Sequence, residues 1–385
     1  MIAPARSAPE TEVGSPASAP GQRRTASSAL MPLMEAVHLL TQHLAPVAPE
    51  AVPLGETVGG TGAVDCHAPR AIPEFPTALR DGWAVRGADV VGASPFAPIL
   101  TGRRPLWVEA GARLLEDADT ILPPEALDGS SIVDEVAVGE GVRAIGAEAS
   151  SDTLLLATGQ RVTALHRLAL QATGFASIAL RRPRLTLIVA GAPELDTVSP
   201  LLAHWVAEAG AVVLGIMAAN TPDAIADVLR TQEGDAVLMI GGTGFGHNDH
   251  AAAGLALAGT ARVHGIALQP GDSAGFGEVG GRPVVLLPGR PDAAVSAFVT
   301  LARPMIATLA GARPTLGSRA PLLSKIASTI GMSEIVFARR MPNGLLPLGG
   351  RDLALASLIQ ADAAILVEPD SEGYPKGSVV QGLPL

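Results

Sequence analysis

A glycine-rich segment in the second half of the chain has the residue types of an anion-binding loop. The apolar run Ala236–Ile240 is followed by GGTGFGHND, with four glycines between positions 241 and 246, and then by an alanine-rich stretch. This order is typical of a strand, a tight loop and a helix. Glycine lets backbone N–H groups come close to a ligand, and a helix N-terminus adds unpaired donors and a partial positive charge. The segment therefore predicts a site for a phosphate-bearing ligand, although glycine turns after strands also occur without one.

The spacing of the glycines separates this loop from two common phosphate-binding motifs. The pattern is GGxGxG, whereas the dinucleotide fingerprint is GxGxxG, and no Lys-Ser or Lys-Thr pair follows as in a Walker A loop. Asp249 ends the segment. Its carboxylate is a candidate ligand for the substrate or a metal ion, and the alternative is that it simply caps the next helix.

The elements that must position this loop are predicted from apolar runs that alternate with helical segments between residues 184 and 311. Near-continuous apolar runs are predicted as strands over Leu185–Ala190, Val212–Met217, Ala236–Ile240 and Val284–Leu287. Helices are predicted between and after them over Ser199–Ala209, Pro222–Thr231, Asp249–Leu257 and Asp292–Leu309. This alternation indicates a mostly parallel sheet covered on both faces. Because ligands of such sheets bind at the carboxyl ends of the strands, Gly241–Asp249 and Pro288–Pro291 are expected on one rim.

The flanking regions predict smaller units. Residues 1–26 have the composition of a disordered leader, and Met31–Leu44 has the spacing of an amphipathic helix. Short strands and a helix are expected before the α/β region over Gly82–Val85, Leu106–Glu109, Ser131–Val138, Leu154–Leu156 and Thr163–Gly174. After Ala312 a small β domain is expected, with strands Ile326–Ala338, Leu345–Leu348 and Ala363–Glu368 and a helix near Leu353–Gln360.

Composition limits the classes of function. The chain has 385 residues, of which 48% are hydrophobic and only 3% aromatic, so several domains with aliphatic cores are expected. The net charge of −10 argues against nucleic acid or an anionic membrane as partner. Cys66 is the one cysteine of the sequence, so no internal disulfide forms. The pair Arg23-Arg24 precedes a short segment containing Glu35, a poor secretory signal, and no apolar run approaches the roughly 18 residues of a membrane helix. A cytoplasmic location is expected.

Five motifs in chain order resemble those of one known family. IPEFPTALRDGWAVRGAD (72–89) resembles P-x-F-D-N-S-A-M-D-G-Y-A-V-R, and GGTGFGHND resembles G-G-V-S-V-G-x-x-D. ALQPGDSAGFG (267–277) resembles A-x-K-P-G-K-P-x-x-F-G, and LLPGRPDAAVSAF (286–298) resembles L-P-G-N-P-V-S-A. The tail GGRDLALASLIQADAAILVEPDSEGYPKGSVV resembles the family's closing β domain. The chain is thereby identified as a divergent member of the MoeA-like molybdopterin molybdenumtransferases, which are related to the gephyrin E domain.

The resemblance implies a multidomain α/β and β fold. It implies a linker domain at 27–70 and 150–182, a β domain at 71–149, an α/β molybdopterin-binding domain at 183–312 and a C-terminal β barrel at 313–385. It also implies a homodimer whose active cleft lies between the α/β domain of one subunit and the β domain of the other. The implied reaction inserts molybdate into adenylated molybdopterin, with Mg²⁺ assisting and AMP released. A molybdoenzyme apoprotein is a possible further partner.

The resemblance also assigns roles to individual residues. Asp81, Asp249 and Glu148 fall at or near functional carboxylates of the family, with Asp81 and Asp249 as the metal ligands. For Asp81 the alternative is a turn aspartate before Gly82, and for Glu148 an ordinary surface carboxylate. Glu194 matches the glutamate of T-G-D-E-L, against a solvated loop residue. The remaining cofactor-binding positions are Gly241, Gly242, Thr243, Gly244, Gly246, Pro270, Gly271, Pro288, Gly289, Arg290 and Pro291.

Departures from the family pattern concentrate around the anion site. Gln269 and Asp272 stand where the family has two lysines, and the second change reverses the charge. Arg290, in place of the Asn of L-P-G-N-P, is a candidate replacement cation or a solvated arginine.

Smaller departures affect neighbouring positions. Gly244 replaces a serine, Ala110 replaces a threonine, and the I-x-D-S/T-N loop survives only as Asp196-Thr197. His247 is an additional side chain of the loop, most simply a solvated one.

These departures leave three interpretations open. The first is an active transferase with a rewired oxyanion site. The second is a non-catalytic molybdopterin-binding carrier or scaffold that keeps the fold and has lost the oxyanion site. The third is a cleft that holds a different, less anionic nucleotide-like molecule. The orientation of Asp272 and Arg290 is expected to discriminate among them.

Overall fold

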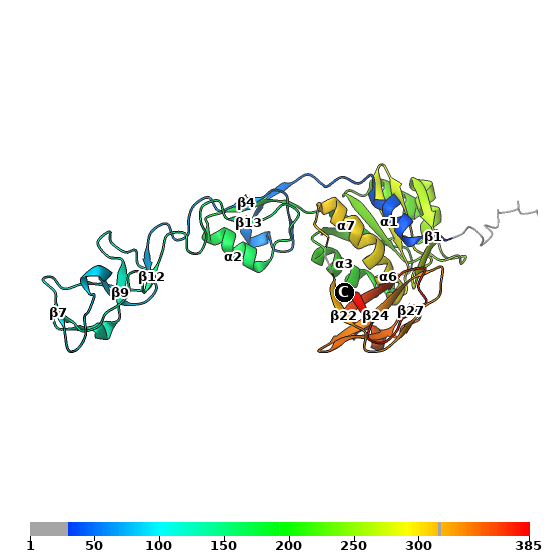
Figure 1. Cartoon of the computed structure of the whole chain (residues 1–385). Helices are drawn as coiled ribbons and strands as arrows, with labels where there is room; N and C mark the ends of the chain where they lie inside the picture. Colours follow the sequence, from blue (N-terminus) through cyan, green and yellow to red (C-terminus); the bar gives the residue numbers. More distant parts are fainter. Residues whose placement is uncertain (1–29, 192, 315–316) are drawn as a thin grey trace, which may run out of the picture.

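The protein is elongated, and its parts lie in a row in the computed structural model (Figure 1). The structure describes residues 30–191, 193–314 and 317–385, so the leader expected at 1–26 lies outside the described residues. A β lobe (71–149) lies at one end and a linker lobe (45–70 and 150–182) in the middle. The other end is a main body in which an α/β domain is joined to a β barrel.

The α/β domain is built on a six-stranded sheet in the order β16-β15-β17-β21-β20-β18. The first four strands are parallel, which confirms the mostly parallel sheet expected from the apolar runs. The strands of this sheet are β15 (Arg184–Val189), β16 (Val212–Ala218), β17 (Ala236–Ile240), β18 (Thr260–His264), β20 (Gly275–Val279) and β21 (Arg282–Leu287).

Helices cover both faces of this sheet, as near-continuous apolar strands require. One face packs against α4 (Pro222–Thr231) and α5 (Ala251–Ala258). The other face packs against α3 (Ser199–Glu208) and a long core helix at 291–310. The predicted strand Ala236–Ile240 and helix Pro222–Thr231 have the bounds that the structure shows.

The core helix is interrupted in its middle for a local reason. It consists of α6 (Pro291–Ala297), a π-helical turn η5 (Phe298–Ala302) and α7 (Arg303–Ala310). Pro304 has no N–H, and its ring would clash with the carbonyl of Thr300 in a regular helix. The wider π turn accommodates the proline without ending the helix.

The same helix corrects one expectation about length and hydropathy. By length and composition alone, Pro291–Ala310 is long and apolar enough to cross a membrane. The expectation that no apolar segment approaches that length was therefore wrong. However, 78% of its apolar stretch is buried inside the protein, which is typical of a core helix.

The N-terminal segment corrects two expectations. The predicted helix Met31–Leu44 is shorter, because Met31–Pro32 forms a strand, β1, that pairs with β19 (Ile266–Gln269), and α1 spans only Leu33–Thr41. The buried side chains of α1 pack in the main-body core with residues of η5 and α7. Assignment of this helix to the linker domain at 27–70 is therefore wrong.

The sheet of the C-terminal barrel is extended by β19, which lies outside the six-stranded sheet of the α/β domain. Its strands are β22 (Ser318–Pro321), β24 (Ser333–Met341), β25 (Gly344–Gly349), β26 (Ala363–Val367) and β28 (Val379–Pro384). A β-bridge between Leu322, which follows β22, and Leu345 of β25 connects the two ends of this set of strands. β19 pairs in parallel with β24, Leu268 opposite Ser333. This pairing holds the loop after β19 against the barrel.

Two strand predictions in the outer parts of the chain were too long. The expected strand Ile326–Ala338 is split into β23 (Ile326–Ala327) and β24, because Gly331 adopts a left-handed φ of 94° between them. In the β lobe the expected strand Ser131–Val138 is only β11 (Ser131–Ile132). The expected C-terminal helix is a single turn, α8 (Leu355–Leu358).

The linker and β lobes are small units with their own cores. Segments far apart in sequence form the linker lobe, where β14 (Ser177–Arg181) pairs with β2 (Glu50–Pro53) and with β3 (Thr61–Gly62) beside α2 (Ala164–Ala172). In the β lobe, β6 (Gly82–Val85) pairs with both β8 (Leu106–Val108) and β9 (Thr120–Leu122). The short remaining strands are β4 (Cys66–His67), β5 (Thr77–Ala78), β7 (Ile99–Leu100), β10 (Leu127–Asp128), β12 (Val142–Arg143), β13 (Leu154–Leu156) and β27 (Gly373–Tyr374).

Candidate functional site

The glycine loop joins the carboxyl end of β17 to α5, as its sequence predicts. Gly241 and Gly242 have φ angles of 80° and 60°, a left-handed region that favours glycine. A Cβ on Gly242 would lie 2.6 Å from the carbonyl oxygen of Ala190, so the close passage of the loop over β15 also requires glycine there. Backbone geometry therefore explains the first two glycines without a ligand.

Asp249 closes the loop on itself. Its Oδ2 accepts a hydrogen bond of 2.8 Å from the N–H of Gly246, and a Cβ on Gly244 would lie 2.6 Å from the same oxygen. A serine at position 244 would require this carboxylate to shift, so the closed form of the loop seen here fits the glycine that this chain has there. The alternative of a simple N-cap is wrong, because the N-cap of α5 is His250, with no side-chain cap bond. His247 is exposed.

Two residues that the sequence analysis missed tie the loop to its neighbours. The hydroxyl of Thr243, only 3% exposed, lies 3.1 Å from the hydroxyl of Ser273. The Nε2 atom of His264 lies 2.7 Å from the carbonyl oxygen of Thr243. Thr243 is therefore a buried anchor, and the loop after β19 is connected directly to the glycine loop.

The second predicted loop, Pro288–Pro291, meets the glycine loop on the same rim. The N–H of Gly241 donates to the carbonyl of Leu287 at 2.9 Å, and a Cβ on Gly289 would lie 3.3 Å from the Cα of Gly241. The expectation that both strand-to-helix loops share one edge of the sheet is confirmed. A side chain at position 289 would push the two backbones apart by a few tenths of an ångström.

Arg290 follows this loop and is strongly bound by carboxylates. Its Nε and Nη2 donate to the two oxygens of Asp292 at 3.0 and 2.8 Å, and its Nη1 donates to Asp352 at 2.6 Å. Asp292 is only 4% exposed. The hydrogen bonds to Asp292, with the nearby charges of both carboxylates, raise the pKa of Arg290 above its usual value. Arg290 is thus ion-paired with two carboxylates, while 54% of its side chain stays exposed to solvent.

A cavity of about 370 Å³, cavity A, lies where the α/β domain meets the barrel. The loop after β19 contributes Gln269, Pro270, Gly271, Asp272 and Ser273 to its lining. Pro288, Arg290 and Ala293 contribute from the second loop and α6, and Met332 and Arg351 contribute from the barrel. The structure thus brings both altered lysine positions together with Arg290. Arg351 is a cation that the sequence analysis missed.

A second cavity of about 310 Å³, cavity B, lies at the end of the glycine loop. Glu194 lines it, together with Asn220, Asn248 and His250. The lining therefore offers a carboxylate, two amides and an imidazole. The neighbouring Asp196 does not line it. Its carboxylate accepts from the backbone N–H groups of Val198, the N-cap of α3, and of Ser199, the first residue of that helix.

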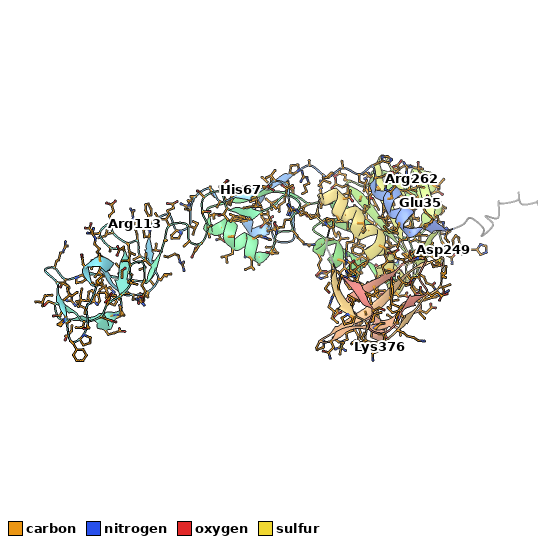
Figure 2. The ribbon with its side chains drawn as sticks, in the orientation of Figure 1. Glu35, His67, Arg113, Asp249, Arg262 and Lys376 are labelled. Atoms are coloured by element: carbon orange, nitrogen blue, oxygen red, sulfur yellow. The ribbon has the colours of Figure 1, made fainter. Side chains whose placement is uncertain are left out.

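The remaining predicted carboxylates lie away from this rim. Asp81 is exposed at the start of β6 in the β lobe, and its Oδ1 accepts from the N–H of Ala110 at 2.8 Å. Glu148 is exposed at the end of the β lobe and is paired with Arg143. In Figure 2, the labelled Arg113 marks the β lobe, and the labelled Asp249 lies on the far side of the main body. One chain therefore does not bring Asp81 and Asp249 together.

The comparisons with known proteins agree with this architecture. Residues 31–174 match the family described as the MoeA N-terminal region (domain I and II), and residues 184–308 match the probable molybdopterin binding domain. The chain is 30% identical over 304 residues to molybdopterin molybdenumtransferase 2 of Mycobacterium tuberculosis, covering 66% of this chain and 74% of that protein. The chain belongs to the molybdopterin molybdenumtransferase family.

More distant members of this family align over nearly the whole chain. A putative molybdopterin biosynthesis protein of Methanocaldococcus jannaschii is 25% identical over 393 residues, covering 91% of this chain and 97% of that protein. The crystal structure of the molybdopterin biosynthesis MoeA protein from Pyrococcus horikoshii superposes with a TM-score of 0.75 at 22% identity, covering 92% of this chain and all of that one. The multidomain fold expected from the motifs is confirmed.

Proposed function

We propose that this transferase-family chain inserts molybdate into adenylated molybdopterin and releases AMP, the last step of molybdenum cofactor assembly. One observation carries the proposal. Two glycine-bearing loops meet at the carboxyl ends of β17 and β21, with cavities A and B beside them. Ligands of open α/β sheets bind at this edge. The relatives' transferase names favour an enzyme over a non-catalytic carrier.

The two cavities differ in chemistry, which suggests separate roles. The amides and imidazole of cavity B suit the uncharged hydrogen-bonding groups of a pterin or nucleotide. The glycine loop suits the phosphates, because it leads into the N-terminus of α5, which attracts anions. Cavity A, with Arg290 and Arg351, is left for the tetrahedral molybdate.

Mg²⁺ belongs to this proposal as an ion held together with the substrate. Among the described residues no group of three or more His, Cys, Asp or Glu side chains is placed to hold a metal. One oxygen of Asp249 accepts from Gly246, and its other oxygen has no hydrogen-bond partner among those residues. Such a single carboxylate fits Mg²⁺, which commonly takes one or two carboxylates plus substrate phosphates and water. The bound ion would neutralise charge on the phosphoanhydride.

A homodimer completes the proposed site. Asp81 lies in the β lobe and Asp249 on the main body, at opposite ends of an elongated chain. A second copy is able to place its β lobe against the rim of the first and so supply Asp81. The proposal therefore includes two equivalent composite sites per dimer. It also includes a cytoplasmic location and delivery of the product to a molybdoenzyme apoprotein.

The direct test is AMP release from adenylated molybdopterin with Mg²⁺, with and without molybdate. We expect release that depends on molybdate and stops when Mg²⁺ is chelated. Tight binding of the pterin without any AMP release would contradict the proposal and favour the non-catalytic carrier. Release that is independent of molybdate would show hydrolysis without metal insertion.

Restoring positive charge at the altered lysine positions should strengthen the response to molybdate. In Gln269→Lys/Asp272→Lys, one neutral and one negative side chain lining cavity A become positive. A charge pair about 4 Å apart is worth roughly 4 kcal/mol at an effective dielectric near 20, before screening. Because Asp272 is exposed and water screens its charge, we expect a gain in binding energy below this figure. The molybdate concentration for half-maximal AMP release should fall about tenfold.

The matched control for this variant carries the same change of charge elsewhere. Gln381→Lys/Asp370→Lys alters two exposed barrel residues that do not line cavity A. We expect its molybdate titration to stay within twofold of wild type, since solvent and salt screen distant charges. Equal titrations for both double variants would show that cavity A does not bind the oxyanion.

A further inference from the structure

The charges around cavity A are nearly balanced, which is unusual for a site that binds a dianion. Arg290 and Arg351 line the cavity, and so does Asp272. Two more carboxylates, Asp292 and Asp352, contact Arg290 directly. Two guanidinium groups therefore face three carboxylates. A tetrahedral dianion binds here only if one of the arginines is released from its carboxylate partner or has donors to spare.

Arg290 has few donors to spare. Three of its five N–H groups are used by Asp292 and Asp352. Its contact with Asp292 is the parallel, two-bond arrangement that guanidinium and carboxylate groups favour. Because Asp292 is buried, exchanging this contact for a ligand would leave a carboxylate unpaired in the core. Arg290 is thus held in place primarily as part of the protein's own structure.

Arg351 is in the opposite situation. It reaches cavity A from the barrel, in the turn between β25 and α8, and its side chain is largely exposed. Among the described residues its guanidinium makes no hydrogen bond. Its one ionic contact within the described part of the chain is a 3.4 Å approach of Nε to Oδ2 of Asp352. Exposed pairs of this kind contribute little to stability, so Arg351 is able to turn its donors to a ligand at small cost.

Asp352 stands between the two arginines. Its Oδ1 accepts from Nη1 of Arg290, and its Oδ2 faces Nε of Arg351. Its φ of 53° is left-handed, a conformation that aspartate tolerates better than most residues. Its two oxygens thus contact the same two guanidinium groups that an incoming oxyanion would use.

We propose that Arg351 and Asp352 set the anion affinity of cavity A. Arg351 supplies the binding charge in place of the two missing lysines. Asp352 competes with the oxyanion for Arg290 and Arg351, and it gives up these contacts when a tetrahedral dianion enters. This inference rests on the proposed function for the identity of the ligand as molybdate, but its charge argument concerns only the cavity.

The test is calorimetric titration of the full-length protein with sodium molybdate, without pterin. Arg351→Ala should weaken molybdate binding about tenfold, the effect of losing one charge-assisted hydrogen bond. Arg351→Lys should recover part of the loss, because it restores the charge without the planar fork. Asp352→Asn should tighten binding by about threefold to tenfold, because it removes the competing charge.

A control and several outcomes keep the proposal open to contradiction. Arg319→Ala removes one exposed positive charge from β22, outside cavity A, and should leave binding unchanged. Unchanged affinity in Arg351→Ala, or weaker binding in Asp352→Asn, would overturn the proposal. So would absence of molybdate binding in both wild type and Asp352→Asn. Binding only in Asp352→Asn would support it.

AMP release, measured separately, distinguishes this proposal from the proposed function. If Arg351→Ala releases AMP with the wild-type response to molybdate, the role of Arg351 is wrong and the transferase activity stands. If wild type binds molybdate through Arg351 but never releases AMP, the charge arrangement stands and the catalytic function is wrong. Thermal unfolding of each variant checks that the barrel is intact.

Discussion

Variants at Asp81 and Asp249 should each be inactive alone and partly active when mixed. Asp81→Ala and Asp249→Asn are each expected to lower AMP release by at least about 100-fold, typical of lost electrostatic stabilisation at a reacting phosphate. After subunit exchange, half of the dimers in an equal mixture contain one variant of each kind. Each such dimer has one complete composite site, so about a quarter of wild-type activity should return.

Asparagine is preferred to alanine at position 249 for a structural reason. The Asp249 carboxylate accepts the hydrogen bond from Gly246 that closes the glycine loop. An asparagine oxygen still accepts this bond, while the charge required for a metal or phosphate role is lost. Asp81 is exposed and is bonded only to the N–H of Ala110 among the described residues, so alanine there should leave the lobe folded.

The control for this experiment is Asp128→Ala, an exposed aspartate in the same lobe as Asp81. It should keep full activity, alone and in mixtures. Full activity of Asp81→Ala would show that Asp81 is only the turn residue that its position before Gly82 also suggests. A mixture as inactive as its components would contradict the composite site between two copies.

Local patterns predicted the part of the site that lies on the parallel sheet. The strands β15, β17 and β21 are buried on both faces, so their sequences are continuous apolar runs that end where the loops begin. The sequence alone therefore predicts both strand-to-helix loops on one rim. The same reasoning does not reveal which way a side chain of these loops points. It left open whether Asp249 was an N-cap, and the contact with Gly246 decided against that alternative.

The antiparallel edge of the α/β sheet was missed although a turn signal marks it. Gly280 and Gly281 form a two-residue hairpin between β20 and β21, with φ angles of 58° and 78°. A Gly-Gly pair between two apolar runs is a strong hairpin signal. The preceding strand β20 is unusual because it begins Gly-Phe-Gly, where backbones pack so closely that a Cβ on Gly277 would lie 2.1 Å from the carbonyl of Thr260. Poor strand propensity hid this element.

Cavity A could not be predicted from spacing, because its two walls come from distant parts of the chain. The pairing of β19 with β24 brings residues near 269 against the barrel. Arg351, about eighty residues later in the sequence, reaches the cavity only through this contact. The altered lysine positions showed that charge was missing, and the sequence offered Arg290 as the replacement. The structure places a second arginine beside it.

Removing Arg290 should lower the free energy of unfolding of the main body. Arg290→Leu deletes the two-bond partner of Asp292, whose carboxylate is 4% exposed and keeps only the N–H of Ala293 among the described contacts. An unpaired buried charge typically costs 3–5 kcal/mol. Because Arg290 itself is half exposed and cavities adjoin the pair, we expect a loss of about 2 kcal/mol in the free energy of unfolding.

A double variant identifies the cause of this loss. Arg290→Leu/Asp292→Asn replaces the unpaired carboxylate with a neutral amide, so it should recover most of the stability in urea unfolding. If the double variant is as unstable as Arg290→Leu, the loss comes from packing of the arginine stem instead. Recovery would mean that the charge of Arg290 is used mainly to hold Asp292 in the core. In that case Arg290 is a poor substitute for the family's lysines, and the charge for an oxyanion must come from Arg351 on the barrel.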